Sequence, residues 1–94
     1  MKNYKLEWTK KAYKEFQQLD QENQQRIRIE LRNLVDYYCG NNEVKIPDVK
    51  RLKGKYNGLF RLRVGKYRVI FKTELHKLVL LIISIVKRGD VYKN

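Results

Sequence analysis

The chain has 94 residues, of which 43% are hydrophobic and 12% aromatic, and its formal net charge is +12. This length suits a single domain, residues 1–94, and leaves no room for a second core. The lone cysteine, Cys39, excludes an intramolecular disulfide and a thiolate metal cluster. No signal peptide is evident, and no apolar run approaches the ~20 residues of a membrane-spanning helix. We therefore expect a cytoplasmic protein that has no membrane partner.

The positive charge is concentrated in the second half of the chain. Residues 48–94 carry thirteen Lys and Arg against three Asp and Glu, whereas residues 1–47 carry nine against seven. This basic half consists largely of segments whose pattern predicts strands. A basic surface built on a sheet and its loops favours a polyanionic partner, for which nucleic acid is the default.

The first half of the chain predicts one strand and two helices. Apolar and polar residues alternate over 4–8, as in a short strand. Thr9 and Asp20 are suitable N-cap residues for two successive helices, and Gly40 suits the end of the second. The two helices would form an αα-hairpin. The residues expected on their inward faces, from their helical spacing, are Ala12, Phe16, Leu19, Ile27, Leu31, Leu34 and Tyr38.

The second half predicts a long loop over residues 40–58, followed by three strands. Residues 60–64 alternate between apolar and polar, and in the next segment Tyr67, Val69 and Phe71 alternate with Arg68 and Lys72. Gly65-Lys66 between the two segments suits a tight hairpin turn. After a second turn near 74–76, residues 78–86 are apolar on both faces, as in a central strand. The predicted fold is α+β: an N-terminal strand, an αα-hairpin and three antiparallel strands in one sheet, with the helices on one face.

Three arginines are expected on the sheet face that points away from the core. Arg61 and Arg63 alternate with apolar residues on one strand, and Arg68 follows the turn on the next. Like charges brought together across strands are destabilising, unless an anion binds them or water solvates them well. A guanidinium suits a phosphodiester because it offers a planar fork of donors and a permanent charge. Both interpretations, an anion site and a solvated edge face, fit the pattern.

The segment after the last predicted strand contains a second group of candidates. Arg88 and Tyr92 follow that strand closely, separated by a Gly-Asp turn. A phenol has a pKa near ~10 and is normally a poor base at neutral pH. If Tyr92 folded back among the arginines, its anionic form would be favoured and its pKa lowered. The alternative is an ordinary packing aromatic.

Several other kinds of site are disfavoured by the sequence. Asp48, Glu74 and Asp90 do not cluster, so we expect neither a two-metal nuclease nor any other metal site. His76 falls in a predicted turn and has no second histidine to form an acid–base pair. Cys39 is expected to fill space at a helix end. The chain has no phosphate-binding glycine loop, and we expect no small-molecule cofactor.

Three segments taken together indicate a family. They are Leu-Lys-Gly at 52–54, Arg-Leu-Arg-Val-Gly-Lys-Tyr-Arg at 61–68 and Lys-Arg-Gly-Asp-Val-Tyr at 87–92. On the basis of these segments, the chain resembles the RelE/ParE superfamily of toxin–antitoxin toxins over essentially its whole length. The resemblance implies a type II toxin with a cognate acidic antitoxin. It also implies one of two activities. RelE-like members cleave mRNA in the ribosomal A site without metal, through attack of the ribose 2′-OH, whereas ParE-like members inhibit DNA gyrase.

The resemblance to the RelE branch implies a role for each candidate. Arg61 and Arg63 would bind the mRNA backbone, Arg68 and Arg88 would stabilise charge on the scissile phosphate, and Tyr92 would accept the 2′-OH proton. RelE-like nucleases often have lysines where Arg61 and Arg63 stand, and a guanidinium is a poor proton donor, so the general acid is left open. The further RNA-binding candidates are Lys50, Arg51, Lys53, Lys55, Lys66 and Lys87.

The sequence therefore favours a ribosome-dependent mRNA endoribonuclease that inhibits translation. A ParE-like gyrase inhibitor needs no Tyr92, and a non-catalytic RNA-binding module needs only the basic strands. The presence of both Arg88 and Tyr92 favours the nuclease over these two alternatives.

Overall fold

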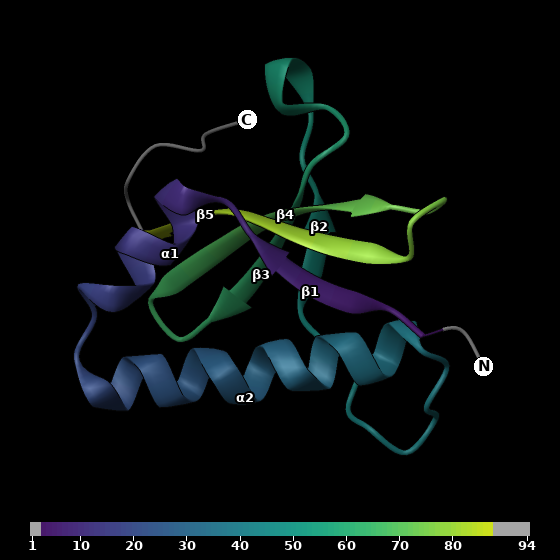
Figure 1. The fold of residues 1–94 in the computed structure, drawn as a ribbon, viewed down its shortest axis with the longest axis horizontal. Helices are drawn as coiled ribbons and strands as arrows, with labels where there is room; N and C mark the ends of the chain where they lie inside the picture. The colour runs from purple at the N-terminus through teal and green to yellow at the C-terminus, as the bar shows by residue number, and fades with distance from the viewer. Residues whose placement is uncertain (1–2, 88–94) are drawn as a thin grey trace.

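The computed structural model describes residues 3–87 and shows two helices packed on a five-stranded mixed sheet (Figure 1). The strand order is β1-β5-β4-β3-β2, and among these described strands only the β1–β5 pair is parallel. The α+β fold predicted from the sequence is confirmed. In chain order the elements are β1 (Lys5–Trp8), α1 (Lys10–Gln17), α2 (Gln21–Tyr38), β2 (Val49–Arg51), the 3₁₀ helix η1 (Gly54–Tyr56), β3 (Phe60–Val64), β4 (Tyr67–Glu74) and β5 (Val79–Lys87).

Both helices begin at the predicted caps. The Thr9 hydroxyl oxygen accepts a hydrogen bond from the backbone N–H of Ala12 at 3.0 Å. The Asp20 carboxylate accepts one from the N–H of Asn23 at 2.9 Å. Each bond satisfies a donor that the first turn of a helix leaves unpaired. Gly40, at a φ of +94°, follows the end of α2 in the left-handed region that favours glycine. No helix among residues 3–87 is long and apolar enough to span a membrane.

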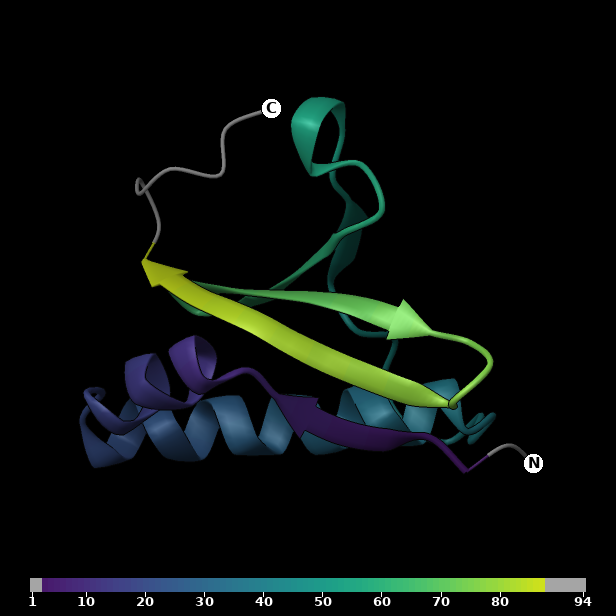
Figure 2. The same cartoon turned by 45° about the horizontal axis from the view of Figure 1, so that its top comes forward.

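The hydrophobic core lies between the helices and one face of the sheet. Figure 2 shows both helices on the same side of the strands. The side chains expected at helical spacing are buried in this core or packed against it, as are the apolar positions of β3. Alternation therefore places one face of β3 against α2 and leaves the other face pointing away. The core residues are Tyr4, Ala12, Phe16, Ile27, Leu31, Leu34, Leu62, Val64, Val69, Phe71, Leu80, Ile82 and Ile85.

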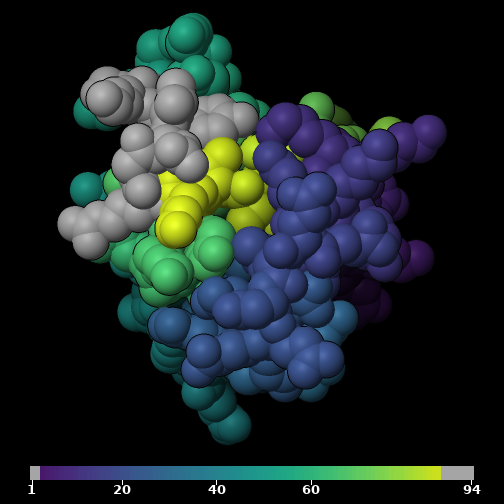
Figure 3. All heavy atoms as spheres, turned by 90° about the vertical axis from the view of Figure 1, so that its left-hand side faces the viewer, coloured from purple at the N-terminus to yellow at the C-terminus, as the bar shows by residue number. Residues whose placement is uncertain are grey.

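The strand β5 lies inside the sheet, as its apolar run predicted. It pairs with β1 on one side, in parallel as far as Ile82, and with β4 on the other. Beyond Ile82, α1 takes the place of β1 beside β5 (Figure 3). There the Glu15 carboxylate accepts hydrogen bonds from the N–H of Ile85 at 2.9 Å and the hydroxyl of Ser84 at 3.1 Å. A helix side chain thus satisfies backbone that would otherwise be an open sheet edge.

The interpretation of residues 40–58 as loop throughout was wrong. Val49–Arg51 form β2, antiparallel to β3, and Gly54–Tyr56 form η1. β2 is only three residues long, and its burial does not alternate. The hydrogen bonds of a ladder come from the main chain, so a short basic segment can pair without the pattern of a strand. The turn between β4 and β5 occupies residues 75–78, slightly later than expected, and His76 is exposed within it as predicted.

The contact between α1 and β5 gives a test of the fold. We expect Glu15→Ala to lower the free energy of unfolding by about 1–3 kcal/mol, because it leaves the Ser84 hydroxyl and the Ile85 N–H without their acceptor. Chemical denaturation measures this change. Glu43→Ala, which removes an exposed acid from the loop after α2, is the control and should change stability far less. Equal losses in the two variants would contradict the role given to Glu15.

Candidate nucleic-acid interface

A hollow of about 360 Å³ lies on the sheet face opposite the helices. We call it the basic hollow, because six of its eight lining residues are Lys or Arg and none of the eight, all within the described part of the chain, is acidic. Ile70 of β4 is fully buried there and belongs to no part of the helix-side core. The segment containing η1 rises on this side of the sheet (Figure 2). The lining residues are Lys50, Arg51, Leu52, Lys53, Arg61, Arg63, Arg68 and Ile70.

The β3–β4 hairpin brings the three predicted arginines together. Gly65 and Lys66 form the turn, and the register that follows from it pairs Arg63 directly with Arg68. Arg61 lies two residues before Arg63 on the same face, opposite Ile70. Arg68 therefore stands close to one of the other two, as its position just after the turn predicted, and all three line the basic hollow.

Arg61 and Arg63 share this face but differ sharply in exposure. Arg63 is exposed, whereas Arg61 is only 6% exposed. A solvated edge face therefore does not describe Arg61. The segment that follows β2 folds over this part of the sheet and buries Leu52, which also lines the basic hollow. Sequence alternation distinguishes the two faces of a strand, but it cannot show that another segment of the chain covers part of the outer face.

Asp48 holds both of these arginines. Its carboxylate lies 3.4 Å from Nη1 of Arg61 and 3.9 Å from Nε of Arg63, and its carbonyl oxygen accepts the backbone N–H of Arg63 at 3.0 Å. The sequence had marked Asp48 only as an acid that clusters with no other acid. Its place beside β3 follows from the β2–β3 pairing, which the sequence pattern did not show.

The Arg61 guanidinium carries five N–H groups, and among the described residues its one side-chain acceptor is Asp48, at the long distance of 3.4 Å. A charged group that is buried needs compensating hydrogen bonds and opposite charge. An anion in the basic hollow would supply both. The arrangement can therefore bind a phosphate group through Arg61 and its neighbours.

The remaining candidates differ in position. Lys50, Arg51 and Lys53 line the basic hollow from β2 and the segment that follows it. The ammonium of Lys55, in η1, lies 5.2 Å from the ring centre of Tyr56 and does not line that hollow.

Four further predicted residues either do not line the basic hollow or fall outside the described part of the chain. Lys66 is exposed in the hairpin turn, and Lys87 is exposed at the end of β5. Arg88 and Tyr92 lie outside the described residues.

The other potentially reactive side chains in residues 3–87 pack in or against the core, or do not cluster with one another. Burial raises the pKa of Tyr38 above its ordinary value, and the nearby Tyr4 and Tyr37 add to the shift. Tyr38 is consequently less suited to act as a base. Cys39 is half-buried against the core. No group of three or more His, Cys, Asp or Glu in this range is placed to hold a metal ion.

Comparison with known proteins identifies the family. Residues 6–92 match the family model of the ParE toxin of the type II toxin–antitoxin system parDE. The chain belongs to this toxin family. Its resemblance to the RelE/ParE superfamily is confirmed, and the protein is accordingly a type II toxin–antitoxin toxin. No curated protein matches the sequence.

Solved structures of RelE toxins share the fold. The archaeal RelE–RelB complex of Pyrococcus horikoshii OT3 is similar with a TM-score of 0.70 and 29% identity, covering 96% of this chain and 100% of that one. RelE in the Methanococcus jannaschii RelB–RelE complex has a TM-score of 0.69 and 20% identity, with coverage of 92% and 94%. The isolated E. coli RelE toxin has a TM-score of 0.66 and 19% identity, with coverage of 95% and 88%. The last two likenesses concern the fold alone.

The contact between Asp48 and Arg61 can be tested through stability. We expect Asp48→Ala to lower the free energy of unfolding by about 1–3 kcal/mol, because it leaves a buried guanidinium without its acceptor. Denaturant titration measures this loss. Asp36→Ala is a suitable control, since Asp36 lies near the end of α2 and lines a different hollow. An Asp48→Ala protein as stable as the Asp36→Ala protein would show that the pair does not hold Arg61.

Proposed function

We propose that this toxin is a ribosome-dependent mRNA endoribonuclease that inhibits translation. The observation that carries the proposal is the basic hollow, where Arg61, Arg63 and Arg68 converge with three further cations and no lining acid among the described residues. Such a site suits the backbone of a single nucleic-acid strand. RelE-like toxins, which the sequence resembles, supply the precedent for an RNA substrate.

The chemistry proposed is transesterification at one phosphodiester. The ribose 2′ oxygen attacks the adjacent phosphorus as its proton passes to Tyr92. The bond from phosphorus to the 5′ oxygen breaks as that oxygen accepts a proton from solvent water. The products are a 2′,3′-cyclic phosphate and a 5′-hydroxyl end. Arg68 and Arg88 stabilise the extra negative charge of the transition state, and Arg61 and Arg63 hold the strand in position. No step requires a cofactor.

The end of β5 pairs with the part of β4 that lines the basic hollow. Val86 pairs with Arg68 across the β4–β5 ladder, and Arg88 comes two residues later in the chain. Tyr92 is five residues beyond Lys87, and five residues span at most roughly 17 Å when extended. Both residues therefore follow the end of β5 within a short length of chain. This reach supports the roles proposed for Arg88 and Tyr92.

The lysines around the basic hollow would hold the toxin on the ribosome. Lys50, Arg51 and Lys53 line the hollow, while Lys55, Lys66 and Lys87 lie on exposed positions of neighbouring elements. Cations distributed in this way bind phosphates without reading bases. We propose that they contact ribosomal RNA and the mRNA on either side of the cleaved bond.

A gyrase inhibitor is the second candidate. The observation that favours it is the family model itself, which describes ParE toxins. A gyrase inhibitor would not require Arg88 and Tyr92 to act on a phosphodiester. Mapping of mRNA ends after incubation with translating ribosomes, alongside a DNA supercoiling assay, separates the two functions.

The catalytic roles give the first test of this proposal. We expect Tyr92→Phe and Arg88→Ala each to lower the rate of mRNA cleavage on translating ribosomes by about 10²-fold or more. Tyr92→Phe removes the proton acceptor, and Arg88→Ala removes a cation that stabilises the negative charge of the transition state. Ribosome binding, measured by co-sedimentation, should change little. Arg32→Ala, on α2, is the matched control for lost positive charge. Full cleavage by the Tyr92→Phe protein would remove Tyr92 from the mechanism and favour the gyrase inhibitor.

We also propose a cognate antitoxin as partner, since RelE is found complexed with RelB, and YoeB with YefM, in the similar structures. A groove of about 420 Å³ between β1 and α2 suits such a partner. Leu6, Trp8 and Val35 give it an apolar surface, and Arg28 and Arg32 flank it. An acidic amphipathic segment that folds on binding would place apolar side chains there and acids near the arginines. Acids that reach Arg63 and Arg68 would compete with RNA for the basic hollow.

Charge should accelerate the encounter with this antitoxin. We expect the double variant Arg63→Gln/Arg68→Gln to slow association about tenfold at low salt, and much less at high salt, as stopped-flow mixing would measure. The double variant Lys10→Gln/Lys14→Gln removes the same charge from the exposed face of α1 and should have a smaller effect. A neutral or basic antitoxin that leaves Arg63 and Arg68 accessible, yet inactivates the toxin, would disprove this mode of inhibition.

A further inference from the structure

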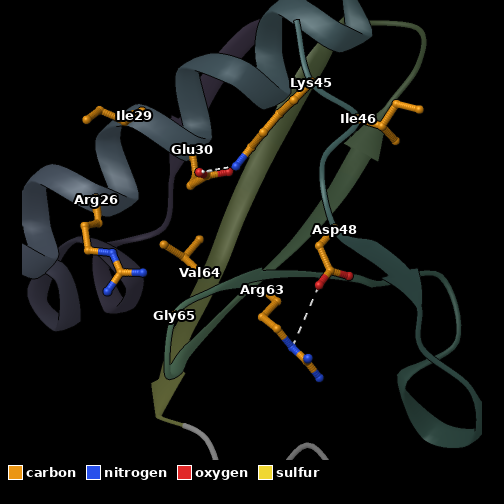
Figure 4. A pocket seen from close by; sticks show the side chains of 9 residues that line it. All are labelled: Arg26, Ile29, Glu30, Lys45, Ile46, Asp48, Arg63, Val64 and Gly65. Atoms are coloured by element: carbon orange, nitrogen blue, oxygen red, sulfur yellow. Dashed lines mark hydrogen bonds and ion pairs between the residues drawn. The ribbon is translucent and has the colours of Figure 1, made fainter.

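A second hollow of about 500 Å³ adjoins the basic hollow at Arg63, which lines both. It is bounded by α2, by the segment leading to β2 and by the β3–β4 hairpin (Figure 4). The lining residues are Arg26, Ile29, Glu30, Lys45, Ile46, Asp48, Arg63, Val64 and Gly65. Because Arg63 is common to the two hollows, a chain bound in the basic hollow can continue past Arg63 into the second one.

The acids of the second hollow already have basic partners. Lys45 Nζ lies 2.8 Å from Glu30 Oε2, and Arg63 Nε lies 3.9 Å from Asp48 Oδ2. Figure 4 shows both contacts as dashed lines. The third cation is Arg26, which takes part in none of the ion pairs or hydrogen bonds found among residues 3–87. The second hollow consequently has one cation more than it has acids, and that cation is available to a ligand.

The β3–β4 turn is shaped to accept the Arg26 guanidinium. A Cβ on Gly65 would lie 3.0 Å from Nη2 and 3.1 Å from Nη1 of Arg26, tighter than most Cβ contacts, so the guanidinium would have to move by a few tenths of an ångström. Figure 4 shows the guanidinium pointing from α2 toward this turn. Glycine at position 65 therefore meets two requirements. The backbone there has a φ of +58°, which favours glycine, and the Arg26 guanidinium approaches closely. Lys66 is exposed in the same turn.

The apolar residues of the second hollow lie at its rim. Ile29 is 56% exposed and Ile46 is 78% exposed, and in Figure 4 their side chains point away from the hollow. A protein segment would need an apolar surface inside the hollow, which Val64 alone does not provide. The groups that face inward are charged, so a polyanion fits better than an amphipathic peptide.

We propose that the second hollow is a subsite for the same RNA strand, in which Arg26 binds a phosphate beyond the one bound by Arg63. This inference rests on the proposed function, since it extends the path of the RNA from the basic hollow. The strand crosses the sheet face at Arg63 and passes the β3–β4 turn, so that α2 contributes to RNA binding. The toxin then contacts a longer segment of RNA than the basic hollow alone would hold.

The test compares Arg26→Gln with Arg32→Gln, which removes the same charge from the same helix but from a different hollow. The probes are fluorescein-labelled single-stranded RNAs of three and eight nucleotides, titrated at several salt concentrations. We expect Arg26→Gln to weaken binding of the longer RNA about three- to tenfold at low salt. It should also reduce the slope of log affinity against log salt by roughly 0.7, the value for one phosphate contact on a single strand. Binding of the three-nucleotide RNA should change less than twofold, and Arg32→Gln should have little effect on either RNA.

Three outcomes would overturn the subsite. They are equal losses in Arg26→Gln and Arg32→Gln, equal losses for the short and long RNAs, and unchanged RNA affinity with weaker antitoxin binding. The last would make the second hollow a protein-docking surface. Cleavage of ribosome-bound mRNA by the wild-type toxin is assayed in parallel. Cleavage without the Arg26 effect would reject the subsite alone, and the Arg26 effect without cleavage would reject the endoribonuclease while retaining the subsite.

Discussion

The two-residue turn between β3 and β4 is the constraint on which both the core and the basic surface depend. It pairs Leu62 with Val69 on the helix side and Arg63 with Arg68 on the other side. Because side chains alternate along a strand, a shift of one residue would place arginines against α2 and leucine in water. The packing of the core therefore also determines where the arginines stand. The free energy gained by burying the apolar face holds together charges that repel one another on the other face.

This surface stores unfavourable electrostatic energy in the free protein. Arg63 and Arg68 stand directly across from each other, and Arg61 is buried beside them with Asp48 as its partner. The Asp48 carboxylate relieves part of the repulsion, although its distances to both arginines are long. A bound phosphate would relieve more, since it brings negative charge and several acceptor oxygens at once. Preorganised cations of this kind need little rearrangement when the anion arrives.

Much of the fold followed from local patterns in the sequence. Thr9 and Asp20 have the side chains that cap helices, and the change from helical to alternating periodicity marked the hairpin that carries Arg63 and Arg68. What could not be predicted depends on contacts between distant segments. β2 forms because β3 offers an unpaired backbone edge, and its own side chains give no such indication. The burial of Arg61 and the place of Asp48 both follow from that pairing. For the same reason, charge alone marked Lys50 and Lys53 as binding residues but did not place them beside the arginines.

The parallel pairing of β1 with β5 has a consequence for synthesis of the toxin. The first strand of the sheet cannot find its neighbour until the last one has been made, since Lys5–Trp8 pair with Val79–Ile82. β4 also lacks its second neighbour until then. Contacts so distant in sequence delay folding, and a chain emerging from the ribosome has neither a complete sheet nor an aligned set of arginines. The sheet that carries the arginines is therefore completed only after β5, the last strand of the described residues, has been made.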